Sequence, residues 1–122
     1  MSLRTALFGA LLVIAGTMSA NAQSKLIMAE EIGCVWCARW NEEISEIYPK
    51  TGEGRAAPLE RMDIHMPYPP ELEFASKLRF TPTFVLMIDN KEVSRLEGYP
   101  GEDFFWGVLG QMLEKASVGV SQ

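Results

Sequence analysis

The position of the two cysteines, Cys34 and Cys37, constrains the fold of this chain more than any other feature. Residues 24–31 (SKLIMAEE) precede the pair and carry a short apolar run, which predicts a buried strand. The apolar residues of 34–48 recur at helical spacing and predict a helix that begins at the first cysteine. A Cys-x-x-Cys pair at a junction between a strand and a helix is a stronger signal than the motif alone.

The remainder of the chain alternates turn residues with short periodic segments. Pro49, Gly52 and Gly54 predict the end of the first helix. The later segments predict, in order, a strand, a short helix, the two strands of a hairpin and a last helix, over 57–65, 71–78, 83–88, 92–97 and 102–116. This β-α-β-α-β-β-α order predicts a small α/β domain in which helices pack on a sheet.

Residues 1–22 have the pattern of a secretory signal peptide. Arg4 precedes an apolar run over 6–15, and the small-residue pattern Ala20-Asn21-Ala22 follows. The run is shorter than the ~20 apolar residues that a membrane span requires. We therefore expect cleavage after Ala22 and a single exported domain over 23–122, with an uncleaved membrane anchor as the alternative. Export would place the thiols in an oxidising compartment.

The composition is that of a globular protein with an acidic surface. Apolar residues make up 48% of the chain and aromatic residues 10%, enough to build a buried core. The formal net charge is −5, and the basic residues are not gathered into a patch. Nucleic-acid binding requires such a patch, so we expect no nucleic-acid partner.

Three kinds of chemistry can use a Cys-x-x-Cys pair. A structural zinc site needs four ligands, and this chain offers only the two cysteines and His65 as typical donors. A purely structural disulfide stabilises a protein most when it closes a long loop, and this pair closes a minimal one. A catalytic dithiol fits best, and we expect neither a metal nor a cofactor.

The helix gives the two cysteines different roles in such a dithiol. Cys34 lies at the helix N-terminus, where free backbone N–H groups and the helix dipole favour the nucleophilic thiolate. Cys37 lies one turn further on the same face, within reach of a mixed disulfide formed by Cys34. We expect Cys34 to be the nucleophile and Cys37 the resolving thiol.

Thr81-Pro82 is a second candidate part of the site. A proline directly before a strand is a candidate for a cis peptide bond, although a trans bond is the commoner case. A cis-proline loop beside the dithiol would leave a backbone edge free to pair with an extended substrate segment. Trp36 and Tyr99 are further candidates for substrate contacts, and Phe80 fits either a docking surface or the core.

Together, the residues Cys34-Val35-Trp36-Cys37, Thr81-Pro82, the closing hairpin and Gly98 resemble the thioredoxin superfamily. The stretches GCVWCARWNEEISEIYPKTGEGRAAPL and TPTFVLMIDNKEVSRLEGYPGEDFFWGVL resemble the periplasmic SoxS-type thioredoxins of bacterial sulfur-oxidation gene clusters. The resemblance implies a thioredoxin fold. Only eleven residues separate Ala22 from Cys34, which leaves no room for the family's extra N-terminal strand and helix, so we expect a four-stranded mixed sheet flanked by helices.

The resemblance also implies a function and partners. Members of this family are thought to keep a carrier protein of the thiosulfate-oxidising system reduced. This chain would then be a monomeric, periplasmic thiol–disulfide oxidoreductase that reduces a disulfide-bearing exported protein. A membrane thiol transporter of the DsbD or CcdA kind would supply its electrons. A disulfide oxidant remains an alternative, as does a copper-handling chaperone that binds Cu(I) through Cys34 and Cys37, with or without His65.

The sequence departs from the thioredoxin pattern at three places. Val35-Trp36 replaces the usual Gly-Pro between the cysteines, and Gly33 replaces the usual tryptophan before them. The buried acid of thioredoxins would fall at Met28, which cannot accept a proton. Glu30 or Glu31 could substitute for it, or could simply be the solvated end of a strand.

Overall fold

The computed structural model describes residues 16 and 22–121, so the predicted signal peptide falls almost entirely outside the described residues. The strands are β1 (Ser24–Glu30), β2 (Leu59–Asp63), β3 (Thr83–Ile88) and β4 (Lys91–Glu97). The α-helices are α1 (Val35–Trp40), α2 (Gly52–Ala56) and α3 (Glu102–Lys115). A π-helical turn covers Asn41–Ser45 and a 3-10 turn covers Tyr48–Lys50. Within the described part of the chain, no helix combines the length and apolarity that a bilayer crossing requires.

The four strands form one mixed sheet in the order β2-β1-β3-β4. β1 runs parallel to β2 and antiparallel to β3, which pairs with β4 as an antiparallel hairpin. The two central strands, β1 and β3, carry the longest runs of fully buried residues, as expected of strands that are covered on both faces. The predicted four-stranded mixed sheet is confirmed.

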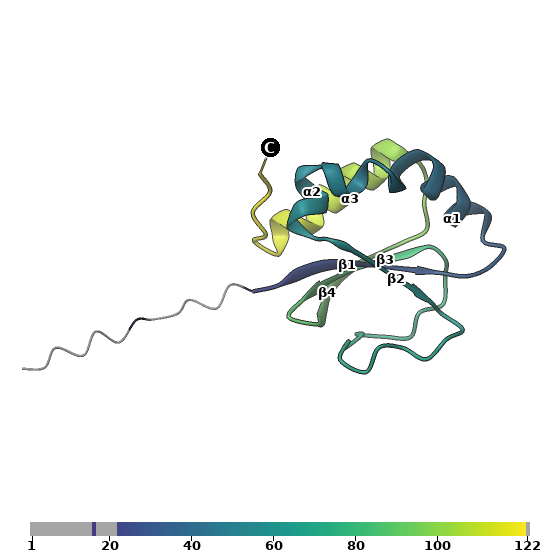
Figure 1. The fold of residues 1–122 in the computed structure, drawn as a ribbon, viewed down its shortest axis with the longest axis horizontal. Coiled ribbons are helices and arrows are strands. Elements are labelled where there is room, and N and C mark those ends of the chain that lie inside the picture. The colour runs from purple at the N-terminus through teal and green to yellow at the C-terminus, as the bar shows by residue number, and fades with distance from the viewer. Residues whose placement is uncertain (1–15, 17–21, 122) are drawn as a thin grey trace, which may run out of the picture.

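The two faces of the sheet are covered differently (Figure 1). All three α-helices lie over one face, where Trp40 and Phe105 pack against Phe84 with ring centres 5.3 and 4.9 Å from it. The other face is covered by the long connection between β2 and β3, whose buried residues Leu72 and Leu78 pack against the sheet. We call the buried cluster that includes Trp40, Phe84 and Phe105 the helix-side core, and the buried cluster that includes Leu72 and Leu78 the loop-side core.

The predicted helix over 34–48 is continuous only in part. α1 ends at Trp40, the chain then widens into the π-helical turn, and the 3-10 turn follows. Asn41 and Ser45, at the two ends of the π-helical turn, both accept hydrogen bonds of 2.8 Å from Arg61 of β2. This contact comes from a strand that lies far away in the sequence, so local spacing could not reveal it.

The first helical stretch ends before Gly52, as expected, but Gly52 and Gly54 do not end it, because both lie inside the separate short helix α2. Thr51 caps this helix, and its Oγ1 accepts a hydrogen bond from the Gly54 N–H at 3.0 Å. A Cβ atom at Gly54 would collide with the backbone carbonyl of Tyr48. The glycine is therefore required for close packing of two backbone segments rather than for ending a helix.

The predicted helix over 71–78 is also wrong, because this segment is irregular. Its backbone finds partners on β4 and on the turn before it. The Glu73 N–H donates to the Asn90 carbonyl at 2.8 Å, and the Glu73 carbonyl accepts from the Glu92 N–H at 2.9 Å. These bonds form an isolated bridge to the edge of the sheet and take the place of helical hydrogen bonds.

Candidate redox site at the start of helix α1

The cysteine pair lies where the chain leaves β1 and enters α1. Gly33 has a φ of +82°, a left-handed backbone conformation that favours glycine, and it turns the chain toward the helix. Cys34 is the N-cap residue of α1, and its Sγ accepts a hydrogen bond from the Cys37 N–H at 3.1 Å. The two cysteines form a disulfide with their Cα atoms 5.2 Å apart. The predicted order of strand, Cys-x-x-Cys and helix is confirmed.

The two cysteines differ in how well they can be reached from solvent. Cys37 is 3% exposed and belongs to the helix-side core, whereas Cys34 is only partly buried at its rim. Ile32, Val35 and Trp36 lie within two residues of Cys34 in the sequence and are 97%, 74% and 51% exposed. A partner protein can therefore approach Cys34 across an apolar surface, while Cys37 lies beneath it.

The segment before β3 is tied to the cysteine loop through Glu31. The Thr81 hydroxyl donates to Glu31 Oε1 at 3.0 Å, and the Glu31 carbonyl accepts from the Cys34 N–H at 3.3 Å. The Thr81–Pro82 peptide bond is cis, and the Pro82 carbonyl accepts from the Gly98 N–H at 2.7 Å. Phe80 is 59% exposed at this place rather than in the core. A shallow hollow of about 310 Å³ is lined by Phe80, Thr81, Glu97 and Gly98.

No carboxylate occupies the position of the usual buried acid. Met28 lies there, fully buried in the helix-side core, and its sulfur is 3.5 Å from Nη1 of Arg61. The Glu30 carboxylate pairs with the same guanidinium at 2.6 Å. Glu31 contacts the candidate site through the hydrogen bond that it accepts from Thr81.

Tyr99 lies below the surface rather than on it. Its side chain is 3% exposed, and its ring packs edge-on against Phe105 with centres 6.2 Å apart. Its hydroxyl donates to Glu43 Oε2 at 2.6 Å. Burial, the hydrogen bond to Glu43 and the charge of that carboxylate all raise the pKa of Tyr99 above its ordinary value. The structure therefore does not present this ring to a partner as the sequence suggested.

His65 does not join the cysteines. Its Nε2 lies 2.7 Å from Glu31 Oε2, and its side chain is largely exposed. Among the residues that the structure describes, no group of three or more His, Cys, Asp or Glu side chains is placed to hold a metal ion. The three residues considered as copper ligands, Cys34, Cys37 and His65, therefore do not come together in the structure.

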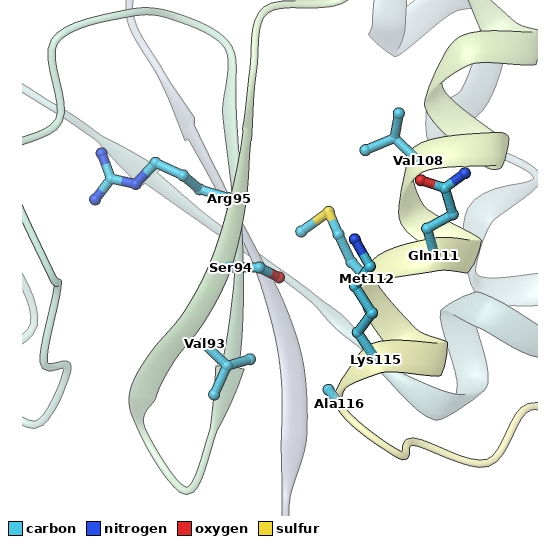
Figure 2. Close-up of a pocket in the computed structure, with 8 residues that line it drawn as sticks. All are labelled: Val93, Ser94, Arg95, Val108, Gln111, Met112, Lys115 and Ala116. Carbon is cyan, nitrogen blue, oxygen red and sulfur yellow. The ribbon is translucent and has the colours of Figure 1, made fainter.

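A separate groove lies between β4 and α3 (Figure 2). Ser94 of β4 and Met112 of α3 point toward each other across it, whereas Arg95 points to the opposite side of the strand. Its lining residues are Val93, Ser94, Arg95, Val108, Gln111, Met112, Lys115 and Ala116. None of them belongs to the predicted site, so this groove is not the place of the cysteine chemistry.

Two residues near the site were not predicted from the sequence. Glu43 of the π-helical turn accepts a hydrogen bond from Arg39 Nε at 2.8 Å as well as from Tyr99. The Arg39 guanidinium lies 5.8 Å from the centre of the Trp36 ring. The sequence hints at the Arg39–Glu43 pair only through its four-residue spacing, and oppositely charged residues at that spacing are common on solvated helix faces.

Comparison with known proteins identifies the family. No protein-family model and no curated protein sequence matches the chain. Among solved structures, the chain is similar to the crystal structure of the periplasmic thioredoxin SoxS from Paracoccus pantotrophus in its reduced form. The identity is 54% and the TM-score 0.75, and the match covers 76% of this chain and 98% of that one. Together with the Cys34–Cys37 pair, this similarity shows that the chain belongs to the SoxS-type thioredoxins and is a thiol–disulfide oxidoreductase.

Proposed function

We propose that this protein is a periplasmic reductase of disulfides or mixed disulfides in an exported partner protein. The Cys34 thiolate attacks one sulfur of the partner disulfide and releases the other as a thiolate, which takes up a proton. Cys37 loses its proton and attacks the Cys34 sulfur, which displaces the second partner thiolate. The partner gains two electrons, and the protein is left with the Cys34–Cys37 disulfide.

The difference in burial between the cysteines carries the assignment of roles. A nucleophile must meet the partner sulfur, and Cys34 is the only one of the two that reaches the surface. The resolving thiol needs to reach only Cys34, and a buried position protects it from competing disulfides. The hydrogen bond from the Cys37 N–H to the Cys34 sulfur supports a thiolate at that atom.

The exposed residues around Cys34 form the docking surface in this proposal. Trp36 contributes an accessible ring, and Thr81 and Pro82 contribute the loop along which an extended partner segment would lie. Phe80 borders the hollow beside that loop. Tyr99 is not part of this surface, because its ring is buried against Phe105.

The partner and the electron donor follow from the family rather than from the geometry. We propose the carrier protein of the thiosulfate-oxidising system as the first partner to test, and a membrane thiol transporter of the DsbD or CcdA kind as the reductant. Export would depend on residues 1–22 as a cleaved signal peptide, and residues 23–122 would act as a monomer. The SoxS relative is described as periplasmic, which supports this location.

A trapping experiment tests the proposal. The Cys37→Ser variant, expressed with its signal peptide in the periplasm, should accumulate a mixed disulfide through Cys34 with a specific exported protein. A reducing agent should release that protein for identification by mass spectrometry. The variant with both Cys34→Ser and Cys37→Ser is the matched control and should trap nothing.

Two further measurements separate the reductase from the alternatives of a disulfide oxidant and a copper chaperone. Equilibration of the purified protein with glutathione gives the reduction potential of the Cys34–Cys37 pair. Absence of a trapped partner, together with the potential of a strong oxidant, would overturn the reductase assignment. Tight stoichiometric binding of Cu(I) to the reduced protein in an anaerobic titration would favour copper handling instead.

A further inference from the structure

A chain of side-chain contacts runs through Glu43 and joins the two sides of the redox site. On one side, Glu43 Oε1 accepts a hydrogen bond from Arg39 Nε at 2.8 Å. The Arg39 guanidinium in turn lies 5.8 Å from the centre of the Trp36 ring, within the range of a cation–π contact. On the other side, Glu43 Oε2 accepts a hydrogen bond from the Tyr99 hydroxyl at 2.6 Å.

The Tyr99 end of this chain is fixed. Its ring is 3% exposed and packs against Phe105 in the helix-side core. The residue before it, Gly98, donates its N–H to the Pro82 carbonyl at 2.7 Å. The contacts therefore extend from Trp36, one of the two residues between the cysteines, to the loop that contains Pro82.

At the Trp36 end of this series of contacts, the side chains are largely exposed to solvent. Trp36 is 51% exposed, and the Arg39 side chain is 53% exposed. An exposed ion pair or cation–π contact is weak when both partners can move. The buried Tyr99 hydroxyl removes that freedom from Glu43, so the carboxylate can hold Arg39 in one place.

The negative charge of Glu43 favours a lasting contact with Arg39. The hydrogen bonds from Tyr99 and Arg39 hold the pKa of Glu43 below its ordinary value. The hydrogen bond and charge of Glu43 raise the pKa of Arg39. Glu43 is therefore a carboxylate throughout the neutral range, and its pairing with Arg39 persists there.

We propose that Glu43 is a positioning residue, which acts through Arg39 to hold the Trp36 ring in the orientation that a partner segment meets beside Cys34. The proposal rests on the proposed function, because it assigns Trp36 to the docking surface. Glu43 itself does not contact the reacting sulfur atoms. Its loss should therefore weaken partner binding and leave the thiol chemistry of Cys34 unchanged.

Fluorine NMR of the protein labelled with 5-fluorotryptophan tests the positioning directly. The Trp36→Phe variant assigns the Trp36 resonance. Glu43→Ala should move that resonance toward its position in Arg39→Ala, while the resonances of Trp40 and Trp106 stay in place. Glu42→Gln is the matched control, because it removes the same charge from an exposed neighbour and should move none of the three.

Kinetics with two disulfides test the consequence for docking. The extended probe is a short synthetic peptide whose cysteine carries a glutathione mixed disulfide, and the small probe is hydroxyethyl disulfide. Glu43→Ala should raise KM for the peptide about threefold, the size expected of an exposed cation–π contact, with little change in kcat. Its rate with hydroxyethyl disulfide should equal that of the unaltered protein.

The outcomes separate this proposal from the proposed function. An unmoved Trp36 resonance in Glu43→Ala would overturn the positioning role, and so would an equal loss of activity with both disulfides. Failure of the unaltered protein to reduce either disulfide would overturn the reductase assignment and leave the NMR comparison to decide the positioning. Tyr99→Phe should reproduce the shift of Glu43→Ala in part, because it removes only the anchoring hydroxyl.

Discussion

Arg95 and Glu92 of β4 form a two-pronged ion pair, with Nε and Nη2 of the arginine each 2.7 Å from one carboxylate oxygen. Their side chains are only 14% and 6% exposed. The same guanidinium donates to the carbonyls of Ser76 and Lys77, and the Glu92 carboxylate accepts from the Ala75 N–H. The pair thereby holds the irregular connection that leads to Pro82 against the sheet.

Loss of Arg95 should loosen that connection. Arg95→Met keeps much of the apolar stem but leaves the Glu92 carboxylate and two backbone carbonyls without their donor. We expect the free energy of unfolding to fall by about 2 kcal/mol, as for other partly buried pairs that lose one member. Urea unfolding measures the loss, and hydrogen exchange should locate faster opening in residues 73–80.

Arg79→Met is the control for that experiment, because Arg79 is an exposed arginine in the same connection. It should change the free energy of unfolding by less than about 0.5 kcal/mol. An equal loss in the two variants would show that the Arg95 contacts do not anchor the segment.

The same pair predicts a pH dependence of stability. Burial alone would raise the pKa of Glu92, but the hydrogen bonds from Arg95 and Ala75 outweigh it and lower the pKa below the ordinary value of 4.5. A carboxyl whose pKa is lower in the folded state stabilises the fold fully above its unfolded pKa and loses that contribution as the pH falls.

Glu92→Gln should therefore be less stable than the unaltered protein at pH 7, and the difference should shrink as the pH falls below about 4.5. Thermal unfolding at a series of pH values measures it. A difference that stays constant down to pH 2 would show that Glu92 stabilises the fold by packing rather than by its charge.

The failure to predict this connection has a physical reason. Leu72, Ala75 and Leu78 are apolar residues at helical spacing, yet only the two leucines are buried. Their spacing fits an irregular strap as well as it fits a helix. The partners of the strap backbone lie on β4 and the turn before it, and nothing within residues 71–78 reveals them.

The candidate site likewise has parts that could be predicted from the sequence and parts that could not. The strand, the cysteine spacing and the following helix are local features, so the positions of Cys34 and Cys37 could be predicted from the sequence. The burial of Tyr99 and its bond to Glu43 join residues 56 positions apart, and no periodicity encodes such a contact. The exposure of Phe80 likewise depends on how the preceding connection packs.

Gly54 offers a test of close packing outside the site. A Cβ atom there would collide with the Tyr48 carbonyl, so Gly54→Ala forces two backbone segments apart. We expect the free energy of unfolding to fall by about 2 kcal/mol or more. Gly107→Ala is the matched control in α3, where a Cβ atom has open space, and it should raise stability by about 0.5–1 kcal/mol. Unfolding in urea compares the two variants, and a stable Gly54→Ala protein would contradict the close approach.

The unequal burial of the cysteines predicts unequal reactivity in the reduced protein. Cys37 is 3% exposed beneath an accessible Cys34, so an alkylating reagent should reach Cys34 first. We expect iodoacetamide to modify the Cys37→Ser variant at least about tenfold faster than the Cys34→Ser variant at neutral pH. Mass spectrometry of timed samples gives both rates. The rates should converge in concentrated urea, where burial no longer distinguishes the thiols, and equal rates in the folded variants would remove the basis for assigning Cys34 as the nucleophile.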